Sequence, residues 1–335
     1  MSHPRIVIVS PALASSNNGN WQTAWRWSQL LQAEFDCTIV QEWQGEPYDV
    51  MLALHARRSA ESIAGWARAR ATSADVPGLA VVLTGTDLYR DIQTDTSAQA
   101  SLQFARRLVV LQECAPQTLP ATWRSKARVI FQSVEKQVSV AKKADGLPIF
   151  RAVMVGHLRE EKSPETLFQA AQWLAAHQDI QIEHIGAALD PALGAQAQAC
   201  AAANANYQWL GSLSHEATLQ HIQQAHILIH ASRMEGGAHV IMEALCSATP
   251  VLASRIEGNI GMLGGDYAGY FPLGDAPALA DLLIACRNDV VQAGHRADAS
   301  IGLYQTLQAQ CAQRAPLFDP AHEQAALIQL VRELL

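Results

Sequence analysis

Residues 226–245 read HILIHASRMEGGAHVIMEAL, and this stretch decides the fold prediction. Its first part, 226–232, is an apolar run with the length and composition of a buried strand, and a longer helical segment follows. Between them stand Gly236, Gly237 and Ala238, whose small side chains let backbone N–H groups approach an anion where a helix begins. We therefore interpret the stretch as a strand, an anion-binding turn and a helix.

Two acids accompany this turn. Glu235 and Glu243 have seven residues between them, which would put Glu243 about two turns into the helix and on nearly the same face as Glu235. Glu243 would then accept hydrogen bonds from sugar hydroxyls, while Glu235 would lie near the reacting group. The alternative is a pair of exposed glutamates on a surface helix, which the flanking apolar runs disfavour.

A second strand-to-helix turn has the sequence VGHLREEKS at 155–163. Gly156 and Lys162 have the spacing of a P-loop, but Glu161 occupies the position of its second glycine. With Ser163 as the expected N-cap of the next helix, a diphosphate here would meet a helix N-terminus and the Lys162 ammonium. Such a site suits a nucleoside diphosphate that leaves with developing charge. The alternative is an ordinary capped helix with exposed charges.

Apolar runs alternate with helical segments twice along the chain, which predicts an α/β protein with two doubly wound parallel sheets of Rossmann type facing a cleft. The polar interval 135–148 reads as a linker between them, or alternatively as a surface loop of one large domain. We predict an N-terminal domain at 1–145, a C-terminal domain at 146–314 and a last helix at 315–335. This helix either caps the C-terminus or returns to the N-terminal domain, and the return is what the family resemblance described below implies. The expected strands are 5–10, 37–43, 50–56, 79–85, 107–112 and 128–132, then 150–156, 180–186, 207–211, 226–232 and 249–254.

The composition excludes several classes of function. A formal net charge of -7 lacks the basic surface that nucleic acid or an anionic membrane requires, and no apolar run approaches the ~18 residues of a membrane span. Six cysteines without a C-x-x-C pair indicate reduced thiols, so we expect a cytoplasmic protein. His226 and His230 would lie ~13 Å apart along a strand, too far to share one ion. We therefore expect neither a metal nor a cofactor.

Together these motifs resemble those of the GT-B glycosyltransferases of the family 4 type. The shared order is a strand with G-x-x-x-x-E-K, then S-x-x-E-G-G followed by E-A, then a loop like ASRIEGNIGML (253–263). The resemblance implies a UDP-sugar donor whose diphosphate binds Lys162, whose transferred sugar contacts Glu235 and whose ribose is held by Glu243. The segment LGSLSHEA (210–217) is similar to the family's loop beneath the base, which implies uracil contacts for Ser212 and Leu213.

This chain departs from the family pattern in the donor half at two places. His157 follows Gly156 where the family has arginine, so a cation is missing above the pKa of histidine near ~6.5, and Arg159 is a candidate substitute. Ala238 replaces a second glycine and His239 replaces an apolar residue. His239 is therefore either a general base or donor toward the acceptor, or a residue of ordinary helix packing.

By the same resemblance, the N-terminal half should hold the acceptor. The turn-rich loop in SSNNGNWQTAWRWSQLL (15–31) places Asn18 and Gly19 among the candidates. The segment LTGTDLYRDI (83–92) is similar to the family's H-G-x-D element, with threonine in place of histidine. It contributes Asp87 as a catalytic candidate and Thr84, Thr86 and Arg90 as acceptor-binding candidates. Losing that histidine is a handicap for a hydroxyl acceptor but not for an acceptor that is already an anion.

The NNGNWQTAWRW loop and the LTGTDLYRDI element together resemble the selenosugar synthase branch of selenoneine biosynthesis. That resemblance implies transfer of the sugar of UDP-N-acetylglucosamine or UDP-glucose to selenophosphate. Two alternatives stay open: a family 4 transferase acting on a hydroxyl or thiol acceptor, and a non-catalytic nucleotide-sugar-binding protein. A dinucleotide-dependent oxidoreductase is disfavoured because no G-x-G-x-x-G follows an expected strand.

Overall fold

The structure is a computed structural model that describes residues 3–13, 19–135, 149–292 and 301–335. Its contacts divide the chain into two compact units. Unit 1 comprises Met1–Ser133, Glu235–Gly237 and Leu317–Leu335, and unit 2 comprises Val134–Met234 and Ala238–Pro316. The expected boundary at 145/146 lies in 136–148, outside the described residues.

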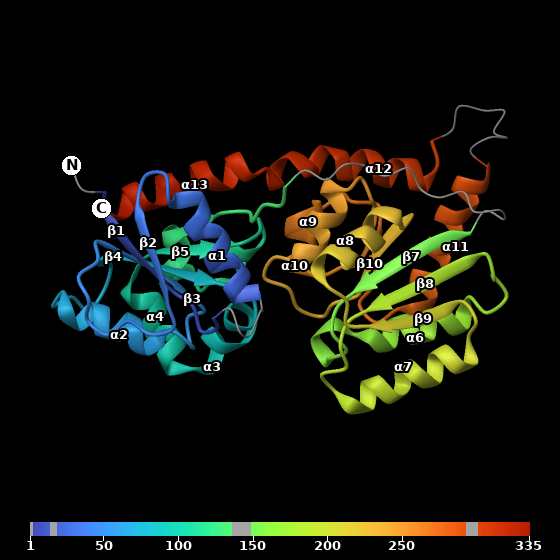
Figure 1. Ribbon diagram of the computed structural model, residues 1–335, viewed down its shortest axis with the longest axis horizontal. Helices are drawn as coiled ribbons and strands as arrows, with labels where there is room; N and C mark the ends of the chain where they lie inside the picture. Colours follow the sequence, from blue (N-terminus) through green and yellow to red (C-terminus); the bar gives the residue numbers. More distant parts are fainter. Residues whose placement is uncertain (1–2, 14–18, 136–148, 293–300) are drawn as a thin grey trace. The chain divides into compact units, whose positions relative to one another are not determined.

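Unit 1 is built on a six-stranded parallel sheet with the order β2-β1-β3-β4-β5-β6 (Figure 1). Chain order reverses at β1, which lies between β2 and β3, as in a doubly wound sheet. The strands are β1 (Arg5–Val9), β2 (Asp36–Val40), β3 (Val50–Leu54), β4 (Val76–Leu83), β5 (Ala105–Val110) and β6 (Ala127–Val129). The other elements are α1 (Gly19–Leu31), α2 (Ala60–Ala69), the π-helix η2 (Asp87–Asp91), α3 (Ile92–Thr94), α4 (Thr96–Phe104), α5 (Ala115–Thr118) and the 3-10 helix η3 (Ala121–Lys126).

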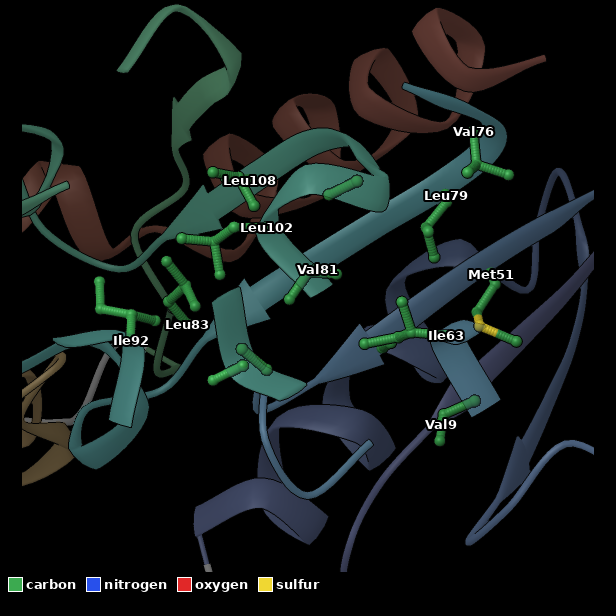
Figure 2. Close-up of a cluster of buried hydrophobic side chains, with 14 of the residues drawn as sticks. Val9, Met51, Ile63, Val76, Leu79, Val81, Leu83, Ile92, Leu102 and Leu108 are labelled. Atoms are coloured by element: carbon green, nitrogen blue, oxygen red, sulfur yellow. The ribbon is translucent and has the colours of Figure 1, made fainter. Parts of the chain in front are cut away.

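The two faces of this sheet bury separate apolar clusters, because successive side chains of a strand point to opposite faces. On one face, Val9, Met51 and Val81 pack with Ile63 of α2 and Leu102 of α4 (Figure 2). On the other face, alternate residues of the same strands pack with α1 and with α13 (Pro320–Leu334). Helices on both faces explain why β3 reads VMLAL without a polar residue.

The C-terminal helix α13 is part of unit 1 and contributes Leu327, Leu330, Val331 and Leu334 to that second cluster. It lies beside α1 and β4 (Figure 1). Glu323 in its first turn is only 2% exposed and is a polar centre of this packing. Its carboxylate accepts hydrogen bonds from Trp27 Nε1 at 2.7 Å, Arg26 Nε at 3.0 Å and Ser133 N at 2.8 Å. Glu323 therefore links α13 both to α1 and to Ser133, where the first segment of unit 1 ends.

Unit 2 has its own six-stranded parallel sheet, with the order β12-β11-β10-β7-β8-β9 (Figure 1). Chain order reverses between β7 and β10, so the loops that follow these two strands leave the sheet side by side. The strands are β7 (Phe150–Val155), β8 (Ile180–Ile185), β9 (Tyr207–Gly211), β10 (Ile227–His230), β11 (Val251–Ser254) and β12 (Tyr270–Phe271).

Helices α6 and α7 lie on one face of this second sheet, and α8 and α9 lie on the other (Figure 1). The helical elements of this part of the chain are the 3-10 helix η4 (Glu160–Lys162), α6 (Pro164–Trp173), α7 (Pro191–Ala203), α8 (His215–Gln224), α9 (His239–Cys246), α10 (Glu257–Leu263), α11 (Ala276–Gln292), α12 (Leu303–Arg314) and the 3-10 helix η5 (Ala315–Phe318). The prediction of two doubly wound parallel sheets is confirmed. The short strand β12 was not predicted, because two residues carry no periodicity.

None of the helices in the described ranges has both the length and the apolar character to cross a bilayer.

The buried carboxylate of Glu323 generates a stability prediction. Replacing Glu323 with alanine leaves Trp27 Nε1 and Arg26 without their shared acceptor, so we expect the free energy of unfolding to fall by about 3–5 kcal/mol. The control is Arg332→Ala on the same helix, which removes an exposed ion pair with Glu34 and should cost less than about 1 kcal/mol. Urea unfolding followed by circular dichroism measures both changes, and equal changes in the two variants would contradict the anchoring role.

Candidate active site

The loop after β7 packs against the loop after β8. Gly156 N donates to Ile185 O and Leu158 N donates to Ala187 O, each at 2.9 Å. Gly186 makes this approach possible: its φ is +155°, and an added Cβ would lie 2.0 Å from Gly156 O. Sequence reasoning missed Gly186 as a site residue, although it is the last residue of the expected strand 180–186. The phosphate-loop candidate is therefore fixed by its neighbour rather than by a glycine cradle of its own.

Within that loop, the side chain of Lys162 lies along Gly156. A Cβ on Gly156 would come within 3.3 Å of Lys162 Cδ, so glycine leaves room for the stem of the lysine. Lys162 ends the 3-10 helix η4, and Ser163 follows in the left-handed region with φ of 50°. Ser163 is the residue before α6, as predicted, but it does not cap the helix with its side chain; its Oγ instead lies 3.0 Å from Thr166 Oγ1.

His157 is neutral in this environment. Its Nδ1 accepts a hydrogen bond from Ala187 N at 3.1 Å, which requires that nitrogen to carry no proton. Burial lowers the pKa of His157, and the positive charges of Arg159 and Lys162 lower that pKa further. His157 therefore does not supply the positive charge that the family resemblance predicts at this position, and the cations of this loop are Lys162 and Arg159.

The fully buried side chain of His184 contacts the same loop. His184 Nε2 lies 3.3 Å from Gly156 O, and its Nδ1 lies 3.0 Å from the Tyr207 hydroxyl. Because a carbonyl oxygen only accepts, Nε2 carries the proton and Tyr207 donates to Nδ1. Burial lowers the pKa of His184 to about 4. This neutral pair holds Gly156 in place without adding charge to the site.

The loop after β10 meets the loop after β7. Arg233 N donates to Glu161 O at 2.8 Å, which links the start of S-x-x-E-G-G directly to the residue before Lys162. Ser232 is buried, and its carbonyl accepts from Ser254 Oγ at 2.6 Å. The side chain of Arg233 is exposed. Sequence reasoning missed Arg233, whose only signal is its place between the motif serine and glutamate.

The position of Glu243 differs from the sequence expectation. Helix α9 begins at His239, with Ala238 as its N-cap residue, so Glu243 is the fifth helical residue and lies one turn into the helix, not two. Glu235 precedes the helix, and the segment Glu235–Gly237 with its two glycines is grouped with unit 1. The shared helical face predicted for the two acids was wrong, because the Gly-Gly-Ala segment delays the start of the helix.

Glu243 is 8% exposed, and its Oε1 accepts a hydrogen bond from His215 Nε2 at 2.7 Å. His215 is the first residue of α8 and directly follows the loop with Ser212 and Leu213, of which Ser212 is exposed and Leu213 half-buried. The structure thus brings the expected base-binding loop and the expected ribose acid together, through a histidine that sequence reasoning had not singled out.

The acceptor candidates of unit 1 follow β4. Asp87 is fully buried, and its carboxylate accepts from Thr84 N at 2.9 Å, Gly85 N at 3.0 Å and, from the neighbouring turn, Ala56 N at 2.9 Å. These backbone contacts occupy both carboxylate oxygens, so they favour an anchoring role over the predicted catalytic role. Arg90 is exposed, with its Nε 3.4 Å from Asp91, and Gly19 begins α1. Asn18 lies outside the described residues.

An imidazole also lies beside Thr86, although threonine replaces the expected histidine at position 84. His55 follows β3, and its Nε2 is 3.2 Å from Thr86 Oγ1. Its φ of 72° is uncommon for a residue with a side chain and is held by the surrounding contacts. Burial lowers the pKa of His55, against the opposing effect of Asp87. Its signal in the sequence was a polar residue at the end of a buried strand.

The described residues contain no group of three or more His, Cys, Asp or Glu side chains placed to hold a metal ion.

Comparison with known proteins agrees with this geometry. Residues 137–289 match the family described as glycosyl transferases group 1. Among solved structures, sucrose-phosphate synthase from Thermosynechococcus elongatus is 17% identical over 99% of each chain, with a TM-score of 0.76. HepE from Anabaena, in complex with UDP and glucose, is 15% identical over 99% of each chain, with a TM-score of 0.70. These identities establish the GT-B fold alone.

A longer protein is also similar. TarM from S. aureus, solved in a complex that includes UDP, is 12% identical with a TM-score of 0.63. The alignment covers 84% of this chain but only 55% of TarM, so this chain spans about half the length of that protein.

His184 generates a pH-dependence prediction. Its pKa is lowered in the folded protein, so the unfolded chain binds its proton first as the pH falls below ~6.5. The stabilisation is present above that pH and is lost as the pH approaches about 4. Between pH 7 and 4.5, wild type should lose about 2–3 kcal/mol more than His184→Gln. Urea unfolding at both pH values measures this difference, and parallel losses would contradict it.

Gly186 generates a steric prediction with a matched control. Gly186→Ala and Gly264→Ala both place a side chain at positive φ, but an added Cβ at Gly264 meets nothing within 4 Å. Gly264→Ala should therefore cost only the conformational strain of roughly 1–3 kcal/mol. Gly186→Ala should cost clearly more, because its Cβ collides with the backbone of Gly156. Similar thermal unfolding temperatures for the two variants would contradict the close approach of the loops.

The prediction of a glycosyltransferase is therefore supported over residues 137–289, which match the group 1 glycosyl transferases, in a chain that has the GT-B fold.

Proposed function

We propose that this chain transfers a hexose from a UDP-sugar to selenophosphate, forming a selenosugar. The observation that carries the donor half of this proposal is the hydrogen bond from Arg233 N to Glu161 O. It joins the two motif loops at the point where strand order reverses, which is where open α/β sheets bind their ligands. The UDP in the HepE and TarM structures supports a uridine nucleotide as the ligand.

In this proposal the donor lies along the carboxyl edge of the second sheet. Lys162, seated against Gly156, binds the diphosphate and stabilises the charge that develops on it as it leaves. Glu243 accepts from the ribose hydroxyls, and Ser212 and Leu213 contact the uracil. Glu235 contacts the transferred sugar, either glucose or N-acetylglucosamine. Arg159 adds the positive charge that the neutral His157 does not supply.

The acceptor half follows from what unit 1 offers. Thr84, Thr86 and Arg90 supply hydrogen-bond donors, whereas the carboxylate of Asp87 is occupied by backbone N–H groups. Among the described residues that follow β4, hydrogen-bond donors without an accessible carboxylate suit an acceptor that arrives as an anion. The selenium of selenophosphate attacks C1 of the sugar, and the C1–O bond breaks with its electron pair leaving on UDP. No proton has to be removed from this nucleophile.

Binding of UDP tests the donor site. We expect Lys162→Ala to weaken UDP binding by about 10- to 100-fold, because it removes charge-assisted hydrogen bonds to the diphosphate. Glu243→Ala should weaken UDP binding as well, since it removes the acceptor for the ribose. Isothermal titration with UDP measures both, with the exposed Arg68→Ala and Glu61→Ala as matched controls that should bind like wild type. Wild-type affinity in the Lys162 and Glu243 variants would refute the assigned site.

Product analysis tests the acceptor. The protein is incubated with UDP-N-acetylglucosamine or UDP-glucose and selenophosphate, and mass spectrometry is expected to find selenium bound to a hexose, together with UDP. Transfer only to hydroxyl or thiol compounds would refute the selenophosphate assignment and leave a glycosyltransferase with another acceptor. UDP binding without turnover on any acceptor would instead identify a nucleotide-sugar-binding protein.

A further inference from the structure

The contact between His215 and Glu243 joins two elements of unit 2 at the expected nucleoside end of the donor. His215 Nε2 donates to Glu243 Oε1 at 2.7 Å, the length of a strong charge-assisted hydrogen bond. The two side chains differ sharply in exposure, at 77% for His215 and 10% for Glu243. The histidine therefore lies over the acid from the solvent side.

This contact leaves most of the carboxylate available to a ligand. A carboxylate offers about four lone-pair sites, and His215 occupies one of them. Within the described ranges, the Glu243 carboxylate accepts no other hydrogen bond, so Oε2 remains open to accept from hydroxyl groups. The two hydroxyls of a ribose diol need only two of the remaining sites. Binding of a nucleoside thus does not require His215 to leave.

We propose that His215 is a positioning residue that holds the Glu243 carboxylate in the orientation that accepts from the ribose hydroxyls of the donor. This inference rests on the proposed function, because it assumes that Glu243 faces the nucleoside. Glutamate has three side-chain torsions, and immobilising such a side chain only upon binding reduces affinity. A contact that already fixes the carboxylate in the unliganded protein removes part of that cost.

The backbone around His215 is itself well fixed. Ser214 is the N-cap residue of α8, and its Oγ accepts from Ala217 N at 3.2 Å. The same loop carries Ser212 and Leu213, so the hydrogen bond to Glu243 also ties the expected base-binding loop to α9. Under the proposed function this loop contacts the base and Glu243 contacts the ribose. The hydrogen bond therefore fixes the positions of these two contacts relative to each other.

For UDP binding, the orientation that His215 gives to the Glu243 carboxylate matters more than the charge of His215. The hydrogen bond to Glu243 raises the pKa of His215. However, His215 is largely exposed, so solvent screens the attraction between the two charges. A neutral donor of the same reach should therefore replace the histidine, whereas a side chain without a donor should not.

Titration calorimetry with two ligands separates this role from a general disturbance. His215→Ala should weaken UDP binding by about 3- to 10-fold, the effect of freeing one side chain. Pyrophosphate, which lacks the nucleoside, should bind His215→Ala as it binds wild type. His215→Gln should bind UDP within about twofold of wild type, because its amide nitrogen takes the place of Nε2.

A double-mutant cycle completes the test. In the Glu243→Ala background, His215→Ala should have no further effect on UDP binding, because the acid it positions is already gone. Equal UDP affinity of wild type and His215→Ala would overturn the inference. So would an equal loss for pyrophosphate, or an undiminished effect in the Glu243→Ala background. Failure of wild type to bind UDP would instead refute the proposed function, and circular dichroism confirms that each variant is folded.

Discussion

The candidate donor site depends on the close approach of two backbone turns, at Gly156 and Gly186. The carbonyl of Gly156 lies where a side chain at position 186 would be, so only glycine permits this contact. Several features follow from it. His157 comes within reach of Ala187 N, His184 lies beneath Gly156 O, and the stem of Lys162 lies along Gly156. A steric constraint in the backbone thereby determines where the stem of Lys162 lies.

The same contact determines the charge of the loop. Because His157 accepts a backbone hydrogen bond and is partly buried, it is neutral at the position where the family resemblance predicts an arginine. The low pKa of His184 keeps the imidazole that contacts Gly156 O neutral as well. Positive charge in this loop therefore comes from Lys162 and Arg159. Under the proposed function, a point charge suits a diphosphate that leaves, whereas an enclosing nest suits one that stays.

Much of this architecture was readable in the sequence, and the failures have physical reasons. Each longer strand was predicted because a sheet covered on both faces needs a continuous apolar run, as VMLAL at 50–54 shows. The prediction placed Glu243 one turn too far into α9, because Gly236 and Gly237 carry no signal for where helical hydrogen bonding starts. His215 and Glu243 are 28 residues apart, and their contact depends on how α8 packs against α9. His55 and Gly186 were at the ends of predicted strands, so a systematic reading of strand ends would have found them.

Glu243 in unit 2 and Asp87 in unit 1 have different numbers of hydrogen-bond partners, and this difference bears on the chemistry of the acceptor. In unit 2, Glu243 keeps one carboxylate oxygen open while His215 holds the other. In unit 1, Asp87 gives both oxygens to the backbone N–H groups of Thr84, Gly85 and Ala56, and it thereby fixes the ends of β3 and β4 against each other. The first arrangement leaves an acid for a neutral polyol such as ribose. The second leaves hydroxyl and guanidinium groups, which attract a substrate that brings its own negative charge. Under the proposed function, the preference for an anionic acceptor therefore arises from an aspartate that the fold has already occupied.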